Sequence, residues 1–266
     1  MGKKKKQSIL WRATKATFRG MGKIIAGTYK FTKRKIKESN QKKKLEKNKV
    51  YNSNHILDEL KIMKTISGDP TIFLERLSKD SLIILIFGKR GSGKTSLGIR
   101  LLENIKAKTN RECCVLGMEN SILPNWINNV EKVEDARNNS IILVDEGAIS
   151  FGSRDSMSSK NKELSKLLAI ARHKNLTLIF VTQNTGMIDK NILKLADTLI
   201  VKEGSLLQLE MERQEMQKFY KKSDVEFSTI KGDKRSHAYV IDSDFEGVIS
   251  YTLPSFWTED ISKNRA

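Results

Sequence analysis

Cysteine, histidine and proline are scarce in this chain, whose 266 residues include only two, three and three of them. The cysteines, Cys113 and Cys114, are neighbours in a predicted strand, where their side chains point to opposite faces and pair poorly. We expect them to be buried small apolar residues of a cytosolic protein rather than a disulfide or a redox site. The histidines are scattered without metal-ligand spacing, so a zinc site is not expected.

Long hydrophobic runs are also missing. The apolar runs at 82–87 and 140–144 are much shorter than the roughly 20 residues that a membrane-spanning helix needs. Basic residues interrupt the stretch 9–31, which therefore lacks the apolar core of a signal peptide. The sequence predicts a cytoplasmic protein that is not secreted and has no transmembrane helix.

Acidic residues are nearly absent from residues 1–50, here called the arm. The arm contains 18 lysines and arginines against two acids, Glu38 and Glu46, so its net charge is +16. The whole chain carries +18, which leaves only +2 for the other 216 residues. The arm is therefore the part of the chain that attracts polyanions.

The arm has two regions of different character. If helical, residues 8–31 place apolar side chains on one face and basic side chains on another. The apolar face comprises Trp11, Phe18, Met21, Ile25 and Tyr29. Residues 32–49 are almost purely cationic and are expected to be disordered or marginally helical on their own. Three partners fit this pattern: nucleic-acid phosphates, an anionic membrane surface or a groove on a partner protein. A solubilising tail would explain the lysines but not the apolar face.

A glycine-rich turn follows the apolar run at 82–87. Residues 88–95 read GKRGSGKT and fill the pattern G-x-x-x-x-G-K-[ST] of a phosphate-binding loop. Residues 96–107 have helical apolar spacing, so the loop lies between a buried strand and a helix, as the motif requires. The residues expected to bind the nucleotide are Gly88, Lys89, Arg90, Gly91, Ser92, Gly93, Lys94, Thr95 and Ser96.

Each part of this loop has a chemical role. Glycines let backbone N–H groups turn inward onto the β-phosphate, and the helix N-terminus adds its partial positive charge. Lys94 is expected to reach the β- and γ-phosphate oxygens of ATP, and the Thr95 hydroxyl to ligate Mg²⁺. A glycine turn without a nucleotide is the alternative, and the strand and helix on either side argue against it.

Two acidic residues end the second apolar run, at 140–144. Asp145 and Glu146 stand at the carboxyl end of a predicted core strand, where parallel sheets bind their ligands. Asp145 is placed to hold the Mg²⁺ water shell, and Glu146 to act as the base that polarises the water attacking the γ-phosphate. The pair predicts hydrolysis at the nucleotide site.

A third predicted strand, at 176–181, ends in Thr182, Gln183 and Asn184. Gln183 is expected to orient the attacking water or to sense the γ-phosphate. The alternative is a polar strand end that makes only turn hydrogen bonds. Three strands that end in polar residues would supply one nucleotide site at the carboxyl edge of a sheet.

Together these motifs resemble the FtsK/HerA superfamily of P-loop ATPases over roughly residues 81–204. The shared features are the phosphate loop, the strand ending in Asp-Glu, and residues 171–175 (ARHKN) before a strand ending in Thr-Gln. Within that superfamily, the chain is similar to viral genome-packaging ATPases and to the ATPase domain of the zonula occludens toxin (Zot) family. The resemblance implies a RecA-like α/β fold with a parallel sheet, in which the Thr-Gln strand lies between the other two.

The resemblance also implies a homo-oligomeric ring, with each site completed by an arginine from the neighbouring subunit. Arg172 matches the position of the family's arginine before the Thr-Gln strand, and Arg154 is the second candidate. An arginine supplied in trans would stabilise the charge that develops on the transferred phosphoryl group.

Other P-loop classes fit the sequence less well. A GTPase should show Asn-Lys-x-Asp at a strand end, where this chain has Thr-Gln-Asn, and the Leu-Ser-Gly-Gly signature of transporter ATPases is absent. Small-molecule kinases remain the enzymatic alternative, although they seldom need adjacent Asp and Glu on one strand.

Length and composition predict one α/β domain with extensions. The expected parts are the arm at 1–50, a helical lead-in at 51–80, the ATPase core at 81–204, and a C-terminal helix and β-hairpin extension at 205–266. The lead-in is expected to contain helices at 54–66 and 70–77. Phe256 and Trp257 are expected to dock on the body or on a neighbouring subunit.

These features predict an ATP-hydrolysing motor that translocates or packages DNA, with ATP and Mg²⁺ at the loop and DNA on the arm. One alternative is a Zot-like, membrane-associated ATPase for virion assembly or export. Another is a nucleotide-dependent switch that binds partners through the arm. The cytoplasm would be that of a host if the chain is viral, with peripheral membrane attachment if the arm binds lipid.

Overall fold

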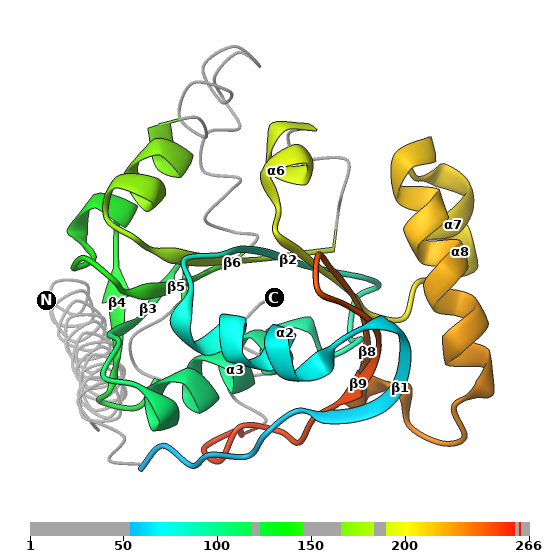
Figure 1. The fold of residues 1–266 in the computed structure, drawn as a ribbon, viewed down its shortest axis with the longest axis horizontal. Coiled ribbons are helices and arrows are strands. Elements are labelled where there is room, and N and C mark those ends of the chain that lie inside the picture. Colours follow the sequence, from blue (N-terminus) through cyan, green and yellow to red (C-terminus); the bar gives the residue numbers. More distant parts are fainter. Residues whose placement is uncertain (1–53, 119–122, 146–165, 184–189, 259–260, 262–266) are drawn as a thin grey trace, which may run out of the picture. The chain divides into compact units, whose positions relative to one another are not determined.

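The structure is a computed structural model that describes residues 54–118, 123–145, 166–183, 190–258 and 261 (Figure 1). The chain divides into two units, Met1–Val50 and Tyr51–Ala266. The first unit, which is the arm, lies outside the described residues, and so do the predictions made for it.

One sheet runs through the described part of the chain, in the strand order β1-β9-β8-β7-β2-β6-β5-β3-β4. Its strands are β1 (Lys61–Gly68), β2 (Ile83–Phe87), β3 (Cys113–Leu116), β4 (Ile127–Val130), β5 (Ile141–Val144), β6 (Thr177–Thr182), β7 (Thr198–Val201), β8 (His237–Asp242) and β9 (Phe245–Ser250). The helices are α2 (Pro70–Lys79), α3 (Lys94–Lys108), α6 (Lys190–Leu195), α7 (Leu206–Met211), α8 (Gln214–Thr229) and the short 3-10 turns η2 (Val133–Asp135) and η4 (Lys234–Ser236). Residues 166–173 are also helical. The strands from β7 to β4 are parallel, and β8, β9 and β1 extend the sheet antiparallel.

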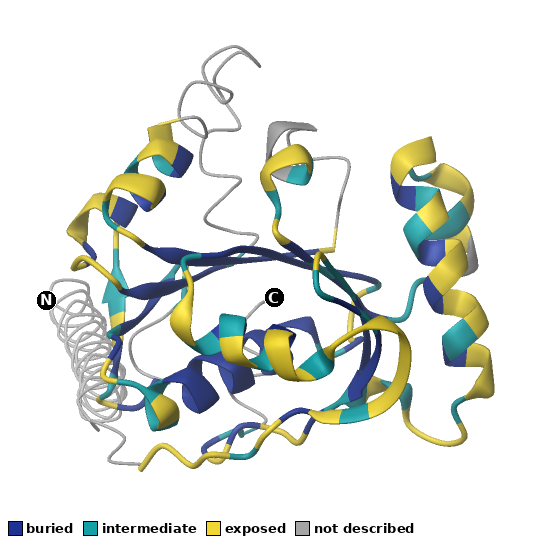
Figure 2. Ribbon diagram, in the orientation of Figure 1, coloured by how far each residue is buried: buried dark blue, intermediate teal, exposed yellow. Residues whose placement is uncertain are grey.

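The central parallel strands β2, β5 and β6 are buried on both faces, which accounts for their almost continuous apolar runs. In β2, Ile84 and Ile86 pack into the core on the side of α2 and α3, whereas Leu85 and Phe87 pack on the side of α8. Figure 2 shows the central strands as a buried band between helices whose outer faces are exposed. Because the strands from β7 to β4 run parallel, their carboxyl ends lie at the same edge of the sheet.

The strand order confirms the predicted RecA-like α/β core. The strand that ends in Thr-Gln, β6, lies between β2 and β5. Its register pairs Phe87 of β2 with Thr182, and Val144 of β5 with Phe180. The predicted strands at 82–87, 140–144 and 176–181 are thus neighbours in one parallel sheet.

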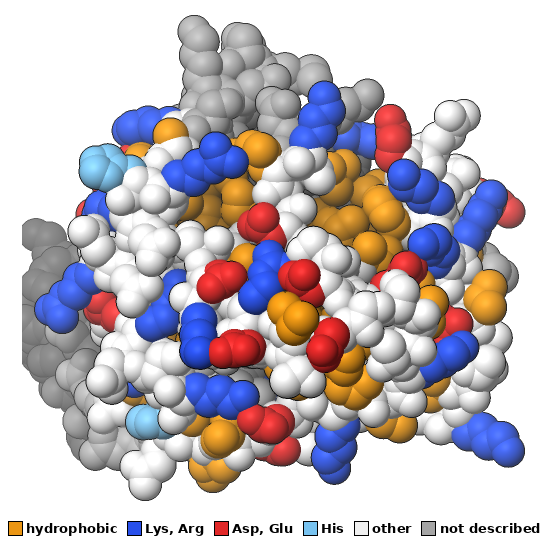
Figure 3. Space-filling view, viewed as in Figure 1, with side chains coloured by type: hydrophobic (Ala, Val, Ile, Leu, Met, Phe, Trp, Pro, Cys, Tyr) orange, Lys and Arg blue, Asp and Glu red, His pale blue; other side chains and the backbone are white. Residues whose placement is uncertain are grey.

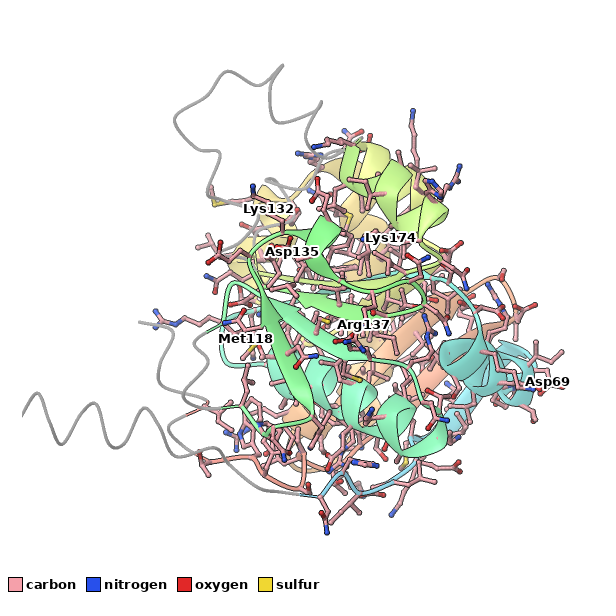
Figure 4. All side chains as sticks on the ribbon, turned by 90° about the vertical axis from the view of Figure 1, so that its left-hand side faces the viewer. Asp69, Met118, Lys132, Asp135, Arg137 and Lys174 are labelled. Carbon is pink, nitrogen blue, oxygen red and sulfur yellow. The ribbon has the colours of Figure 1, made fainter. Side chains whose placement is uncertain are left out.

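The predicted helix at 54–66 is wrong. Residues 61–68 form β1, which pairs antiparallel with β9 from the far end of the chain. β1 lies at the sheet edge and is exposed along almost its whole length, so its sequence has no buried, alternating face that would predict a strand. The second lead-in helix is present as α2, whose first turn is capped by Asp69 through a 2.7 Å hydrogen bond from the Thr71 N–H (Figure 4).

The predicted C-terminal hairpin is present as β8 and β9. It is not a separate extension, however, because β8 pairs with β7 and thereby joins the central sheet. Phe256 and Trp257 dock on the body, as predicted. Phe256 is 4% exposed and meets Trp126 edge-on, with ring centroids 5.7 Å apart, and Trp257 packs against the same core. The hairpin is therefore an integral part of the domain.

A buried ion pair on α3 holds two distant segments together. Arg100 and Glu103 lie 2.9 Å apart, with side chains only 3% and 0% exposed. Glu103 accepts hydrogen bonds of 3.0 Å from the backbone N–H groups of Ile56 and Ser255. Arg100 donates to the Thr252 carbonyl at 3.1 Å. The helix that follows the phosphate loop is thus tied to the start and to the end of the domain.

Replacing Glu103 with alanine should destabilise the domain by about 3 kcal/mol, because the Arg100 charge then stays buried without its carboxylate. A matched control is Glu75→Ala, which removes an exposed ion pair with Lys79 and should leave the unfolding midpoint almost unchanged. Urea unfolding followed by circular dichroism compares both variants with the wild type. Equal midpoints for the two variants would show that the buried pair does not stabilise the domain.

Candidate functional site

The phosphate loop, Asp145 and Gln183 lie at the carboxyl edge of the parallel strands. The phosphate loop leaves β2, Asp145 follows β5, and Gln183 follows β6. Phe87 pairs with Thr182 on one side and with Val201 on the other, so Gly88 is level with Gln183 and Lys202. The sheet therefore places the loop between the ends of β6 and β7.

The phosphate loop has the backbone conformation that its glycines permit. Gly91 and Gly93 have φ angles of 74° and 88°, and Gly93 is the N-cap of α3. The Lys94 ammonium folds back over the loop and donates to the carbonyls of Gly88 and Lys89, at 3.0 and 2.8 Å. The loop thus wraps around the ammonium of its own lysine, and these two hydrogen bonds hold the Lys94 side chain in place.

One buried hydroxyl of the loop has no hydrogen-bond partner. The Ser92 side chain is 1% exposed, and its Oγ makes no hydrogen bond. An unpaired buried hydroxyl costs free energy unless a ligand pairs with it. Its position in a glycine-rich loop at the N-terminus of α3 fits a bound phosphate group.

Two oxygen ligands suited to Mg²⁺ lie at the same edge of the sheet as the loop. Thr95 lies in the first turn of α3, and Asp145 is half-buried after β5, where its N–H donates to the Leu116 carbonyl at 3.1 Å. A hydroxyl and a carboxylate are the hard ligands that Mg²⁺ prefers, with water completing its shell. These two residues would hold the metal. The predicted base Glu146 lies outside the described residues.

Gln183 is exposed at the end of β6, next to a buried Thr182. Its backbone is held from the other side of the site, because the Gln208 side chain of α7 donates to the Gln183 carbonyl at 3.0 Å. The strand order thus places this polar strand end between the phosphate loop and Asp145. Its role toward water or phosphate stays a prediction.

Arg172 lies away from the loop of its own chain. It is exposed in the helix 166–173, just before the amino end of β6, so the six residues of that strand, roughly 17 Å, separate it from the site edge. Its neighbour Lys174 has a structural role, since its ammonium donates to the Ala136 carbonyl at 2.8 Å, beside η2. Figure 4 shows Lys174, Asp135 and Arg137 on this side of the molecule. Arg154 lies outside the described residues.

Sequence reasoning missed the residues that stand behind the loop. Lys202, directly after β7, is completely buried, and Tyr251, after β9, is 5% exposed. Lys202 donates to the Tyr251 hydroxyl at 3.0 Å. Burial, together with repulsion from Lys94, lowers the pKa of the Lys202 ammonium well below the usual lysine value, against the smaller opposing effects of Asp233 and Glu203. A single lysine after an apolar strand resembles any solvated strand end, so no sequence signal marked it.

Comparison with protein families agrees with this geometry. Residues 84–203 match the family described as "ATPase family associated with various cellular activities (AAA)". The chain contains an AAA-type P-loop ATPase domain. The match begins in β2 and ends just beyond β7, so it spans the phosphate loop, Asp145 and the Thr-Gln strand. This ATPase domain binds and hydrolyses ATP.

Solved structures similar to the chain include B204, the DNA-packaging ATPase of Sulfolobus Turreted Icosahedral Virus, at 16% identity and a TM-score of 0.47, over 65% of this chain and 98% of that one. The genome-packaging NTPase B204 of Sulfolobus turreted icosahedral virus 2, in complex with ATP-gammaS, has 15% identity and a TM-score of 0.46 over the same shares. The pCW3 conjugation coupling protein TcpA, with ATPgS, has 12% identity and a TM-score of 0.43, over 70% of this chain and 66% of that one. No curated protein sequence matches the chain.

Replacing Lys94 with alanine should weaken ATP binding by about tenfold or more, because it removes an ammonium that hydrogen-bonds to charged phosphate oxygens. Lys108→Ala is the matched control, since Lys108 lies at the far end of α3 and pairs with Glu59. Isothermal titration with ATPγS measures both. Unchanged affinity in Lys94→Ala would exclude this lysine from the phosphate site.

Proposed function

We propose that the chain is an ATP-driven motor of the FtsK/HerA type that moves DNA, with genome packaging as its task. The observation that carries the proposal is the position of β6 between β2 and β5, the arrangement that the sequence resemblance implies. It brings a Thr-Gln strand end between the phosphate loop and the acidic strand end. The AAA-type match over residues 84–203 supports ATP hydrolysis as the energy source.

The residues at the sheet edge divide the work of hydrolysis. The loop N–H groups, Ser92 and Lys94 bind the β- and γ-phosphates, and Thr95 and Asp145 would hold Mg²⁺. When bound, the metal neutralises charge on the phosphate oxygens. Glu146 accepts a proton from the attacking water, whose oxygen bonds to the γ-phosphorus as the bond to the bridging oxygen of ADP breaks.

DNA is proposed as the load because positive charge is concentrated in the arm. The arm carries +16 of the net charge of +18. On the face of the body shown in Figure 3, blue and red side chains are interleaved rather than gathered by sign. A nearly neutral body with a strongly basic arm favours phosphate neutralisation by the arm.

A ring would complete the site. Arg172 lies roughly 17 Å along β6 from the carboxyl edge of its own sheet, so it is poorly placed to act on its own loop. We propose that it reaches the γ-phosphate bound by the neighbouring subunit and stabilises the charge formed there. Hydrolysis then depends on contact between subunits.

A mixture of two inactive variants tests this arrangement. Glu146→Gln should bind ATP but not hydrolyse it, because an amide cannot take the proton from water. Arg172→Ala should also be inactive. Mixed rings contain junctions with an intact glutamate and an intact arginine, so ATPase activity should partly return, as measured by phosphate release.

Mixed assembly is verified by co-purification of differently tagged subunits. Glu146→Gln that hydrolyses ATP at the wild-type rate would remove Glu146 as the base. If mixed rings show no activity, the arginine supplied by the neighbouring subunit is Arg154 instead of Arg172, or no such arginine takes part in hydrolysis.

Deleting residues 1–49 tests the arm. Basal ATPase activity should change little, because the predicted nucleotide contacts lie between Gly88 and Gln183. DNA affinity should fall by about a hundredfold or more, since the deletion removes most of the net positive charge. Titration of fluorescent double-stranded DNA at two salt concentrations measures this, and the wild-type affinity should fall log-linearly with salt.

The apolar face of residues 8–31 supports a second candidate, a Zot-like ATPase that works at a membrane surface. None of the helices in the described residues is long and apolar enough to cross a membrane. This candidate would be favoured if part of the arm's binding to anionic liposomes resists salt. A double variant, Trp11→Ser with Phe18→Ser, should then lose this binding while it still binds DNA. If the deletion variant binds DNA and liposomes as tightly as the full chain does, the arm has neither role.

A further inference from the structure

The phosphate loop is supported from behind by the C-terminal part of the domain. The Tyr251 hydroxyl lies 2.7 Å from the Gly93 carbonyl and 2.8 Å from the Arg235 carbonyl. Gly93 is the N-cap of α3, and its carbonyl also accepts the first helical hydrogen bond, from Leu97 at 3.1 Å. A residue outside the segment 84–203 thus holds the point where the loop becomes a helix.

Lys202 orients this tyrosine. Its ammonium has three N–H donors and three acceptors: the carbonyl of Arg235 at 2.7 Å, the carbonyl of His237, and the Tyr251 hydroxyl oxygen at 3.0 Å. Because the hydroxyl oxygen accepts from Lys202, its single hydrogen points away from Lys202 and is shared between the carbonyls of Gly93 and Arg235. The ammonium also lies 4.6 Å from the centre of the Tyr251 ring. We call Lys202 and Tyr251 the brace.

Two glycines of the loop motif lie directly against the brace. A Cβ atom on Gly93 would come within 2.7 Å of the Tyr251 hydroxyl and of the Arg235 carbonyl oxygen. A Cβ atom on Gly88 would come within 2.7 Å of the Lys202 Cβ. At Gly91, by contrast, a Cβ would meet nothing within 4 Å. The loop is therefore packed against the brace at both ends and open in its middle.

A completely buried lysine is costly, because burial in a low dielectric disfavours its charge. Its three acceptors offset part of this cost. Shape alone does not require an ammonium at this position, since methionine has a similar length and no charge. An N–H donor at this position is explained if it fixes the Tyr251 hydroxyl, and through it the loop.

We propose that Tyr251, oriented by Lys202, is a positioning residue of the ATPase site. It fixes the Gly93 carbonyl, and with it the first turn of α3, in the place from which the loop N–H groups bind the phosphates of ATP. The C-terminal hairpin is thereby part of the nucleotide site, although it lies outside the loop, the acidic strand end and the Thr-Gln strand. The inference rests on ATP binding at this loop and does not depend on DNA as the load.

The test compares two tyrosines of the same hairpin in the full chain. Tyr251→Phe removes the brace hydroxyl, whereas Tyr239→Phe removes the hydroxyl of another buried tyrosine, which donates to Glu246 within the hairpin. Both variants should lower the melting temperature of the nucleotide-free protein. Only Tyr251→Phe should weaken ATPγS binding, by about fivefold, the effect of losing one hydrogen bond from a preorganised site. Its KM for ATP should rise by a similar factor while kcat changes little.

Lys202→Met provides a second, independent variant. It should weaken ATPγS binding by a similar factor, and combining it with Tyr251→Phe should weaken binding less than the product of the two single effects, because both act through one contact. If Tyr251→Phe binds ATPγS as tightly as Tyr239→Phe, the proposal is overturned. If Tyr251→Phe does not fold, wild-type affinity in Lys202→Met overturns it instead. A wild-type chain that fails to bind ATPγS would refute the ATP site itself, whereas loss of DNA binding leaves these affinities unaffected.

Discussion

Burial of the central parallel strands β2, β5 and β6 on both faces is the constraint on which the rest of this structure depends. In β2, alternate residues enter two separate cores, one beneath α2 and α3 and one beneath α8. The connections between successive parallel strands are crossovers, and a crossover returns the chain to start the next strand in the same direction, so the parallel strands all end at one edge. The phosphate loop, Asp145 and Gln183 are brought together there because their strands are neighbours, without direct contact among their side chains being needed.

Buried charged side chains connect this edge of the sheet to the rest of the domain. Arg100 and Glu103 tie α3 to the segments around Ile56 and Ser255, and Lys202 supports the loop itself. Charged groups are costly inside a protein unless their donors and acceptors are matched. Here the partners are mainly backbone groups of segments distant in sequence, so the charges are matched only when the whole domain is folded. Folding of the domain and formation of the loop are thereby made cooperative.

Much of the core was predictable because a strand buried on both faces leaves a strong local signal. Residues 82–87, 140–144 and 176–181 are continuous apolar runs, and the loop motif and the Asp-Glu pair stand directly after two of them. The AAA-type match over 84–203 agrees with that reading. The strand β1 was mistaken for a helix because it is exposed and pairs with β9 from the other end of the chain. The short strand β4 was not predicted, since two of its four residues are asparagines.

The sequence by itself determined the chemistry of the site: a loop that binds phosphate, acidic residues after a core strand, and a basic arm. These follow from residue types at close spacing, which local rules can interpret. Only the tertiary structure decided that the hairpin joins the central sheet, that Arg172 lies at the edge opposite its own loop, and that Lys202 and Tyr251 support Gly93. A lysine after one strand and a tyrosine after another have no local relation. They meet because β7, β8 and β9 pair side by side, and strand pairing is a property of the whole chain.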